Sequence, residues 1–270
     1  MAILDDFRID GRVAIVTGAG RGIGQGVAKV YGEAKAKVVV ADLDEGPAKE
    51  TLEMVKAAGG EGVVVTGDVS KKADVEKIVK TALDTYGGLD IMANIAGITR
   101  DGMAHKMTED MWDFIIGVNL KGTFFCCQAA LNAMRDLAKK EGKEPKSRKI
   151  VNISSIAGLY GNKGQANYSA AKSGIIGLTK TMAIEGLMFR IGCNCVAPGW
   201  VDTRLTREKK EGEVIGIPAQ DRQMSLMFMN AMNIRIGVPL DLARVVYFLS
   251  CDASDYVVGQ TINVSGGLRV

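Results

Sequence analysis

The 270-residue sequence has little of what a metal or haem site requires. It contains one histidine, His105, and five cysteines, and no two of these cysteines form a C-x-x-C pair. Zinc sites and c-type haem attachment both depend on such ligand sets, so we predict no metal site. We interpret the five thiols as small buried side chains of a protein in a reducing compartment.

An excess of one charge sign and long apolar runs are lacking too. The sequence has 34 Lys and Arg against 31 Asp and Glu, a net charge of +3 with both signs spread along the chain, which argues against a nucleic-acid partner. No stretch reaches the roughly 18 uninterrupted apolar residues of a membrane span. The N-terminus is acidic where a signal peptide would be basic. We therefore expect a cytoplasmic protein without a membrane partner.

Short β-branched segments alternate with segments of helical spacing. Several of the strands are apolar almost without alternation, which is typical of parallel strands covered on both faces. This rhythm predicts an α/β fold, a single doubly wound parallel sheet (Rossmann-type) of about seven strands with helices on both faces. No shift in composition marks a second domain, so we expect one domain, residues 1–270. The expected strands are residues 12–17, 37–41, 62–66, 89–93, 149–154, 193–197 and 261–264.

Two local features complete this interpretation. Ser70 is placed to cap a helix that ends at Gly87-Gly88. Residues 139–149, with six basic and two acidic residues, are predicted to form a solvated charged loop. Contact of this loop with an anionic carrier or a coenzyme phosphate is the alternative.

A glycine-rich turn follows the first strand and leads into a helix over residues 25–33. Gly18 and Gly22 permit a turn that brings backbone amides and a helix N-terminus against a pyrophosphate, and Gly24 lets that helix pack closely on the sheet. Asp42 closes the second strand, 18 residues after Gly24, near the ~20 expected of an acid that binds ribose. Its carboxylate would repel a 2′-phosphate, whereas Arg21 could pair with one. We expect Asp42 to decide, and the cofactor to be NAD.

Tyr168 and Lys172 are four residues apart in a helical segment, so their side chains share one face. A phenol must lose about three pKa units, or about 4 kcal/mol, to exchange a proton near neutrality. An ammonium at ~4 Å supplies about that much at an effective dielectric constant of ~20. Ser154 and Ser155 end a strand just upstream, where a hydroxyl could hydrogen-bond the substrate oxygen.

From Gly11 to Gly267 the chain resembles the short-chain dehydrogenase/reductase family. The glycine turn and the Y-x-x-x-K pair carry this resemblance, with residues 94–97 (NIAG, where the family has NNAG) and residues 198–203 (PGWVDT). Ser155 lies at the family's spacing, thirteen residues before Tyr168. The implied catalytic residues are Asn119, Ser155, Tyr168 and Lys172, with Asn119 helping to hold a water in line with the lysine. The implied cofactor contacts are Gly18, Arg21, Gly22, Ile23, Gly24, Asp42, Asp68, Val69, Asn94, Ala96, Gly97, Tyr168, Lys172, Pro198, Gly199, Val201 and Thr203.

Within the family, residues 94–101, 164–172 and 258–267 are similar to β-ketoacyl carrier-protein reductases. Those reductases typically prefer NADPH and have no acid at the position of Asp42. This departure favours an NAD-dependent dehydrogenase of a secondary alcohol, either a hydroxyacyl thioester or a bulky hydrophobic carbinol. An NADPH-dependent reductase of fatty-acid synthesis and a non-catalytic NAD(H)-binding sensor or silent subunit are the alternatives.

The resemblance also implies a substrate lid and an assembly. The family builds its lid after Thr203, and here residues 203–236 are rich in methionine, with Leu226 and Phe228 among them. A methionine-rich lid favours an apolar or bulky substrate, because methionine adapts to irregular surfaces. A helix pair that merely covers the core is the alternative. The family's usual homotetramer, formed through the long helices at 120–137 and 168–189, is expected as well.

Overall fold

A computed structural model describes residues 3–209 and 216–269, and these form a seven-stranded parallel sheet in the order β3-β2-β1-β4-β5-β6-β7. The predicted fold class is confirmed. The observed strands differ from the predicted ones by two residues or fewer at each end. They are β1 (Val13–Thr17), β2 (Lys37–Asp42), β3 (Glu61–Thr66), β4 (Ile91–Asn94), β5 (Arg148–Ile153), β6 (Ile191–Pro198) and β7 (Thr261–Val264).

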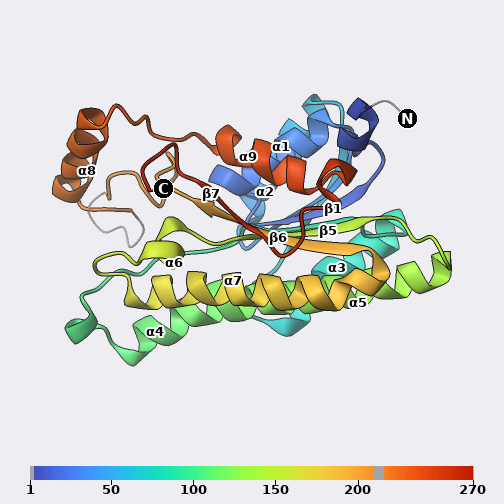
Figure 1. Cartoon of the computed structure of the whole chain (residues 1–270), viewed down its shortest axis with the longest axis horizontal. Coiled ribbons are helices and arrows are strands. Elements are labelled where there is room, and N and C mark those ends of the chain that lie inside the picture. The colour runs from blue at the N-terminus through green and yellow to red at the C-terminus, as the bar shows by residue number, and fades with distance from the viewer. Residues whose placement is uncertain (1–2, 210–215, 270) are drawn as a thin grey trace.

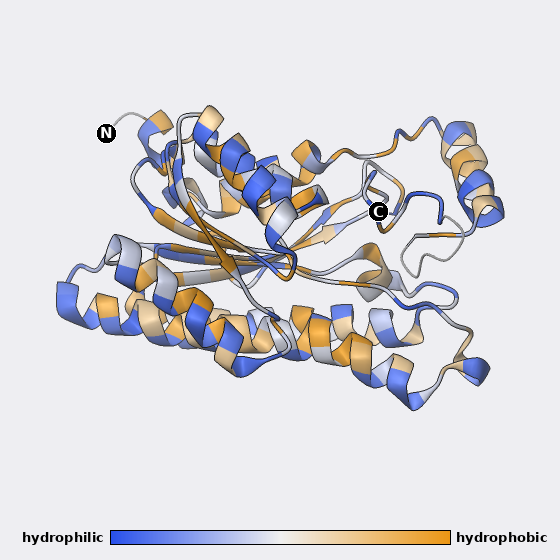
Figure 2. Ribbon diagram, turned by 180° about the vertical axis from the view of Figure 1, so that it is seen from behind, coloured by the Kyte–Doolittle hydropathy of each residue, from blue (hydrophilic) through white to orange (hydrophobic). Residues whose placement is uncertain are grey.

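Helices cover both faces of the sheet (Figure 1). One face carries α1 (Gly22–Glu33), α2 (Glu45–Ala57) and α9 (Pro239–Leu249), and the other carries α3 (Lys72–Tyr86), α5 (Gly122–Glu141) and α7 (Ala166–Gly186). Successive residues of β1 point to opposite faces, so Ala14 and Val16 pack in one core while Val13 and Ile15 pack in the other. This double burial explains the near-continuous apolar strands, which Figure 2 shows between the two helical layers.

Helix α3 begins later than its sequence suggests. The residue before its first turn is Lys71, and Ser70 does not cap it. Ser70 instead donates its amide and its hydroxyl to the Asp68 carboxylate, at 2.9 and 2.7 Å. The predicted cap is therefore wrong, because this serine forms a local turn with the aspartate two residues before it. The helix ends as expected at Gly87, whose φ of +73° satisfies a left-handed C-cap.

The predicted charged loop at 139–149 is only partly a loop. Helix α5 extends to Glu141, and strand β5 begins at Arg148. Arg148 and Lys149 are 2% exposed, and each is paired: Arg148 with Glu141 at 2.6 Å and Lys149 with Asp255 at 2.5 Å. The prediction failed for these two cations because ion pairing and strand formation bury them, whereas charge alone predicts exposure.

One continuous helical run within the described residues, Glu109–Glu141, is long and apolar enough to cross a membrane by those two criteria. It comprises α4 (Glu109–Ile115), a π-helical turn (Ile116–Lys121) and α5. Its apolar residues include Cys127, Ala130 and Met134, which are buried against the sheet and α3. Packing in the core therefore accounts for the composition of this run.

Two glycines give a matched test of close packing in the fold. A Cβ on Gly24 would lie 2.1 Å from the carbonyl oxygen of Gly18, whereas a Cβ on Gly46 in α2 would meet nothing within 4 Å. We expect Gly24→Ala to destabilise the protein by about 2–3 kcal/mol, because backbone must shift to accept the methyl group. Gly46→Ala should be neutral or stabilise by up to about 1 kcal/mol. Urea unfolding monitored by circular dichroism measures both, and equal stabilities would contradict the role of Gly24.

Candidate active site

A cavity of about 1150 Å³ lies at the carboxyl ends of the strands, where the order reverses between β1 and β4. Such a reversal opens a crevice, because the chain leaves the two strands toward opposite faces of the sheet. Every predicted site residue lines this cavity except Asn94 and Asn119. The sheet thus brings together segments that are far apart in the sequence.

The glycine turn presents an uncapped helix N-terminus to the cavity. Helix α1 begins at Gly22, after an extended Arg21 that makes no side-chain cap. Gly22 has a φ of +57°, and a Cβ there would lie 3.3 Å from the Thr203 methyl group, which also belongs to the cavity lining. Free backbone amides at the positive end of a helix suit a phosphate group. The turn therefore fits the diphosphate of a dinucleotide.

The carboxylate of Asp42 is held in place at one end of the cavity. Its Oδ2 accepts the amide of Gly20 at 2.7 Å, and its Oδ1 accepts the amide of Asp44 at 3.0 Å. A Cβ on Gly20 would approach that Oδ2 to 2.9 Å, so glycine is needed there. Arg21 is paired with Asp44 at 2.6 Å. Sequence analysis missed Gly20 and Asp44, whose roles depend on contacts across the turn.

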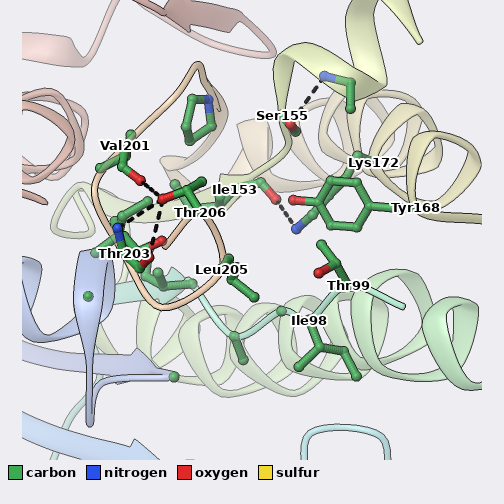
Figure 3. Close-up of a pocket in the computed structure, with 18 of the residues that line it drawn as sticks. Ile98, Thr99, Ile153, Ser155, Tyr168, Lys172, Val201, Thr203, Leu205 and Thr206 are labelled. Atoms are coloured by element: carbon green, nitrogen blue, oxygen red, sulfur yellow. Dashed lines mark hydrogen bonds between the residues drawn. The ribbon is translucent and has the colours of Figure 1, made fainter. Parts of the chain in front are cut away.

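Tyr168 and Lys172 project from one face of α7 toward Ser155, which follows β5 (Figure 3). The Nζ of Lys172 lies over the Tyr168 ring, 5.5 Å from its centroid, and donates to the carbonyl of Ile153 at 2.9 Å. The Ser155 hydroxyl accepts the amide of Ala157 at 3.1 Å and caps α6 (Ile156–Tyr160). Its neighbour Ser154 is buried and donates to the Lys172 carbonyl at 2.7 Å, which ties β5 to α7.

Burial dominates the electrostatics of this pair. It raises the pKa of Tyr168 to about 12, although the Ser155 hydroxyl acts in the opposite direction. It lowers the pKa of Lys172 to about 8. The expectation of an acidic phenol is therefore corrected: desolvation by burial raises the pKa of Tyr168, and the Lys172 ammonium lies over the ring face. At neutral pH the phenol holds its proton and the lysine is charged.

The two remaining asparagines lie behind the cavity wall. Asn94 is buried and its side chain donates to Asn152 at 2.8 Å, and its predicted contact with a cofactor stays a prediction. Asn119 lies in the π-helical turn and bonds both backbone groups of Ile98 through its side-chain amide. A Cβ on Gly97 would meet its Oδ1 at 2.7 Å and the Nζ of Lys172 at 3.2 Å, so both groups flank that glycine. The predicted relay role of Asn119 stays a prediction.

Comparison with known proteins identifies the family. The sequence profile of the short chain dehydrogenases matches residues 12–214. The chain belongs to the short-chain dehydrogenase family. Its members are oxidoreductases that act on CH–OH or ketone groups and bind a nicotinamide cofactor, which agrees with the fit of the glycine turn.

Named relatives span nearly the whole chain. A 3-oxoacyl-acyl-carrier-protein reductase FabG of Thermotoga maritima is 36% identical over 98% of this chain and all of its own. Subunit BbsD of a hydroxy(phenyl)methylsuccinyl-CoA dehydrogenase of Thauera aromatica is 38% identical over 96% of this chain and 97% of its own. The crystal structure of a putative short-chain alcohol dehydrogenase of Sinorhizobium meliloti superposes with a TM-score of 0.85 at 33% identity, covering 97% of both chains.

Helix α8 (Ala219–Ala231) stands apart from the helical layers and borders the cavity (Figure 1). Met224 and Phe228 line the cavity and remain 55% and 56% exposed, whereas Met229 is buried. Within the described part of residues 203–236, α8 is one helix and Met229 is its one buried residue. Among the described residues of this segment, no helix pair covers the core. Residues 210–215 of the expected lid lie outside the described part of the chain.

The buried charge of Lys172 predicts a pH-dependent stability. Its pKa is about 8 in the folded protein and 10.5 ordinarily, so the unfolded chain binds more protons between these values and stability rises with pH there. Relative to Lys172→Met, the wild-type protein should gain about 2 kcal/mol between pH 8 and pH 9.5, at about 1.4 kcal/mol per pH unit. Urea unfolding of both proteins at each pH measures this difference. A difference independent of pH would contradict it.

Proposed function

We propose that the protein is an NAD(H)-dependent oxidoreductase that interconverts a secondary alcohol and a ketone. One observation carries the proposal: a single cavity has the fixed Asp42 carboxylate at one end and Ser155, Tyr168 and Lys172 at the other. The catalytic assignments, including Asn119 as a relay, are part of this proposal. The bound nicotinamide supplies or accepts the hydride.

The side chains of the catalytic end would manage the proton. In the reducing direction Tyr168, a phenol at neutral pH, would donate its proton to the carbonyl oxygen, and in oxidation its phenolate form would receive the proton of the alcohol. The Ser155 hydroxyl hydrogen-bonds the same substrate oxygen, where charge changes during the reaction. The Lys172 ammonium favours a phenolate through its charge and can hold ribose hydroxyls of the cofactor.

Two carboxylates support NAD over NADP. Asp42 would accept hydrogen bonds from the adenosine ribose hydroxyls, whereas it would repel a 2′-phosphate at short range. Asp44 lines the same end of the cavity and already occupies the guanidinium of Arg21, the cation that could attract such a phosphate. The electrostatic balance there is therefore negative.

For the substrate we propose a hydroxyacyl thioester or a bulky hydrophobic carbinol. Met224, Phe228 and Leu205 line the cavity with exposed or half-exposed apolar surface, consistent with residues 203–236 acting as a lid. The Thauera aromatica relative is named for a hydroxyacyl-CoA substrate, which supports the thioester. We also propose that the protein is a single domain and cytoplasmic. We propose a homotetramer, because Ile184, Leu187 and Met188 expose apolar side chains near the end of α7.

A second candidate is an NADPH-dependent 3-oxoacyl carrier-protein reductase. The name of the Thermotoga maritima relative and the presence of Arg21 in the glycine turn favour it. Reduction of acetoacetyl-CoA with NADH and with NADPH separates the candidates, and a strong preference for NADPH would reject ours. A non-catalytic sensor is disfavoured, because Ser155, Tyr168 and Lys172 are all present and line one cavity.

Replacing the proposed acid–base group tests the chemistry. Tyr168→Phe should lower kcat by about 10²- to 10⁴-fold, because the phenylalanine has no proton to exchange. NADH binding, followed by nucleotide fluorescence, should stay within a few-fold of wild type. Tyr160→Phe is the matched control, because Tyr160 lines the same cavity and is half exposed. Retained turnover in Tyr168→Phe would refute the assignment.

Replacing the carboxylate at the other end tests the cofactor preference. The ratio of kcat/KM with NAD to kcat/KM with NADP should fall by about 100-fold in Asp42→Ala. This fall corresponds to losing about 3 kcal/mol of the free-energy difference by which the carboxylate favours NAD over NADP. Asp68→Asn is the control: it removes another acid at this end of the cavity and should change kcat/KM with NAD and kcat/KM with NADP by the same factor. An unchanged ratio in Asp42→Ala would contradict the role of this carboxylate.

A further inference from the structure

We propose that Arg204 and Arg269 together bind an anionic group of the substrate, a carboxylate or a phosphate. This inference rests on the proposed function and narrows its substrate class. Both arginines line the cavity, and neither belongs to the glycine turn or to the catalytic group. They come from two segments that are 65 positions apart in the sequence but lie against each other in the fold.

Arg204 lies in a tightly bonded turn after β6. The amide of Thr206 donates to the Thr203 carbonyl at 3.0 Å, and the Thr206 hydroxyl accepts the Thr203 amide at 3.1 Å while donating to the Val201 carbonyl (Figure 3). These hydrogen bonds join residues before Arg204 to Thr206 after it, and so fix the backbone of the turn that carries Arg204. A fixed backbone reduces the ordering cost when its side chain binds a ligand.

Arg269 lies in a second bonded turn, after β7. Its carbonyl accepts the Asn263 side-chain amide at 2.5 Å and the Ser265 hydroxyl at 3.0 Å. This turn packs on the segment that leads to Arg204, because a Cβ on Gly199 would lie 2.7 Å from the Cα of Ser265. The two arginines therefore belong to the same wall of the cavity.

Neither guanidinium has an acidic partner among the described residues. Arg21, the third arginine that lines the cavity, is paired with Asp44. Arg207 and Arg235, which do not line it, are paired with Asp202 and Asp241. Of the described acids that line the cavity, Asp42 ends β2, Asp44 and Asp68 follow β2 and β3, and Asp113 lies on α4. Among the described residues that line the cavity, the wall that carries Arg204 and Arg269 contributes these two cations and no carboxylate.

The chemistry of this wall selects a ligand class. A guanidinium is a planar fork of donors that matches the oxygens of a carboxylate or a phosphate. Beside the arginines, Leu205, Phe228 and Leu268 supply apolar surface. The ligand is therefore an apolar alcohol or ketone with an anionic group. That group is either a carboxylate of the substrate itself or a phosphate of a coenzyme A thioester.

Three compounds with one acyl chain separate these sources: 3-hydroxyoctanoate, its coenzyme A thioester and its neutral N-acetylcysteamine thioester. Arg204→Ala and Arg269→Ala should each weaken binding of an anionic compound by about tenfold and leave the neutral thioester within about twofold. Isothermal titration in the presence of NADH measures binding directly, and KM values provide a second readout. If the variants weaken binding of the free acid, the arginines bind a carboxylate of the substrate. If they weaken binding of the coenzyme A thioester alone, the arginines bind a phosphate.

Arg207→Ala is the matched control, because Arg207 lies three residues from Arg204, is paired with Asp202 and does not line the cavity. Equal effects on all three compounds, or no effect on any, would overturn the proposal. A tenfold loss of NADH affinity in Arg204→Ala would also overturn it by assigning the arginine to the cofactor diphosphate. Turnover of the neutral thioester by wild type tests the proposed function independently of both arginines.

Discussion

The reversal of strand order between β1 and β4 is the constraint on which the site depends. All seven strands of the described chain are parallel, so their carboxyl ends meet at one edge of the sheet. The loops after β1 and β4 still touch, since a Cβ on Gly18 would lie 2.7 Å from the Cα of Ala96. The crevice opens beyond that contact, between the helix N-terminus at Gly22 and the helix that carries Tyr168.

The end of this crevice that holds Tyr168 and Lys172 is buried like the hydrophobic core, although it contains a charged group. Lys172 is 2% exposed, and its neighbours Ser154 and Ile153 bond its backbone and its ammonium. Burial favours the neutral lysine and the neutral phenol of Tyr168, so the folded protein loses stability by keeping the ammonium there at neutral pH. If Tyr168 transfers a proton as proposed, a positive charge beside it is the functional reason to retain the ammonium.

The sequence predicted the structure correctly where a local pattern of residues is compatible with only one structural environment. Apolar strands such as residues 38–41 can only be covered on both faces, and a glycine turn between a strand and a helix has few other uses. It failed where a side chain had a choice of partner. Ser70 bonds Asp68 rather than α3, and Arg148 is buried with Glu141. The tertiary fold or a local turn brings those partners near. The spacing of residues in the sequence does not determine which partner a polar side chain bonds.

The two ends of the cavity differ in how strongly the fold constrains them. The cofactor end consists of strand ends and the first turn of α1, where the sheet's hydrogen bonds fix each residue, so a motif there implies a position. The substrate wall consists of the turn at Thr203, helix α8 and the segment after β7, which pack mainly on one another. Such segments can change without disturbing the sheet. The substrate must therefore be inferred from the charges and apolar surface that this wall presents, and Arg204 and Arg269 are the described cations of this wall that line the cavity.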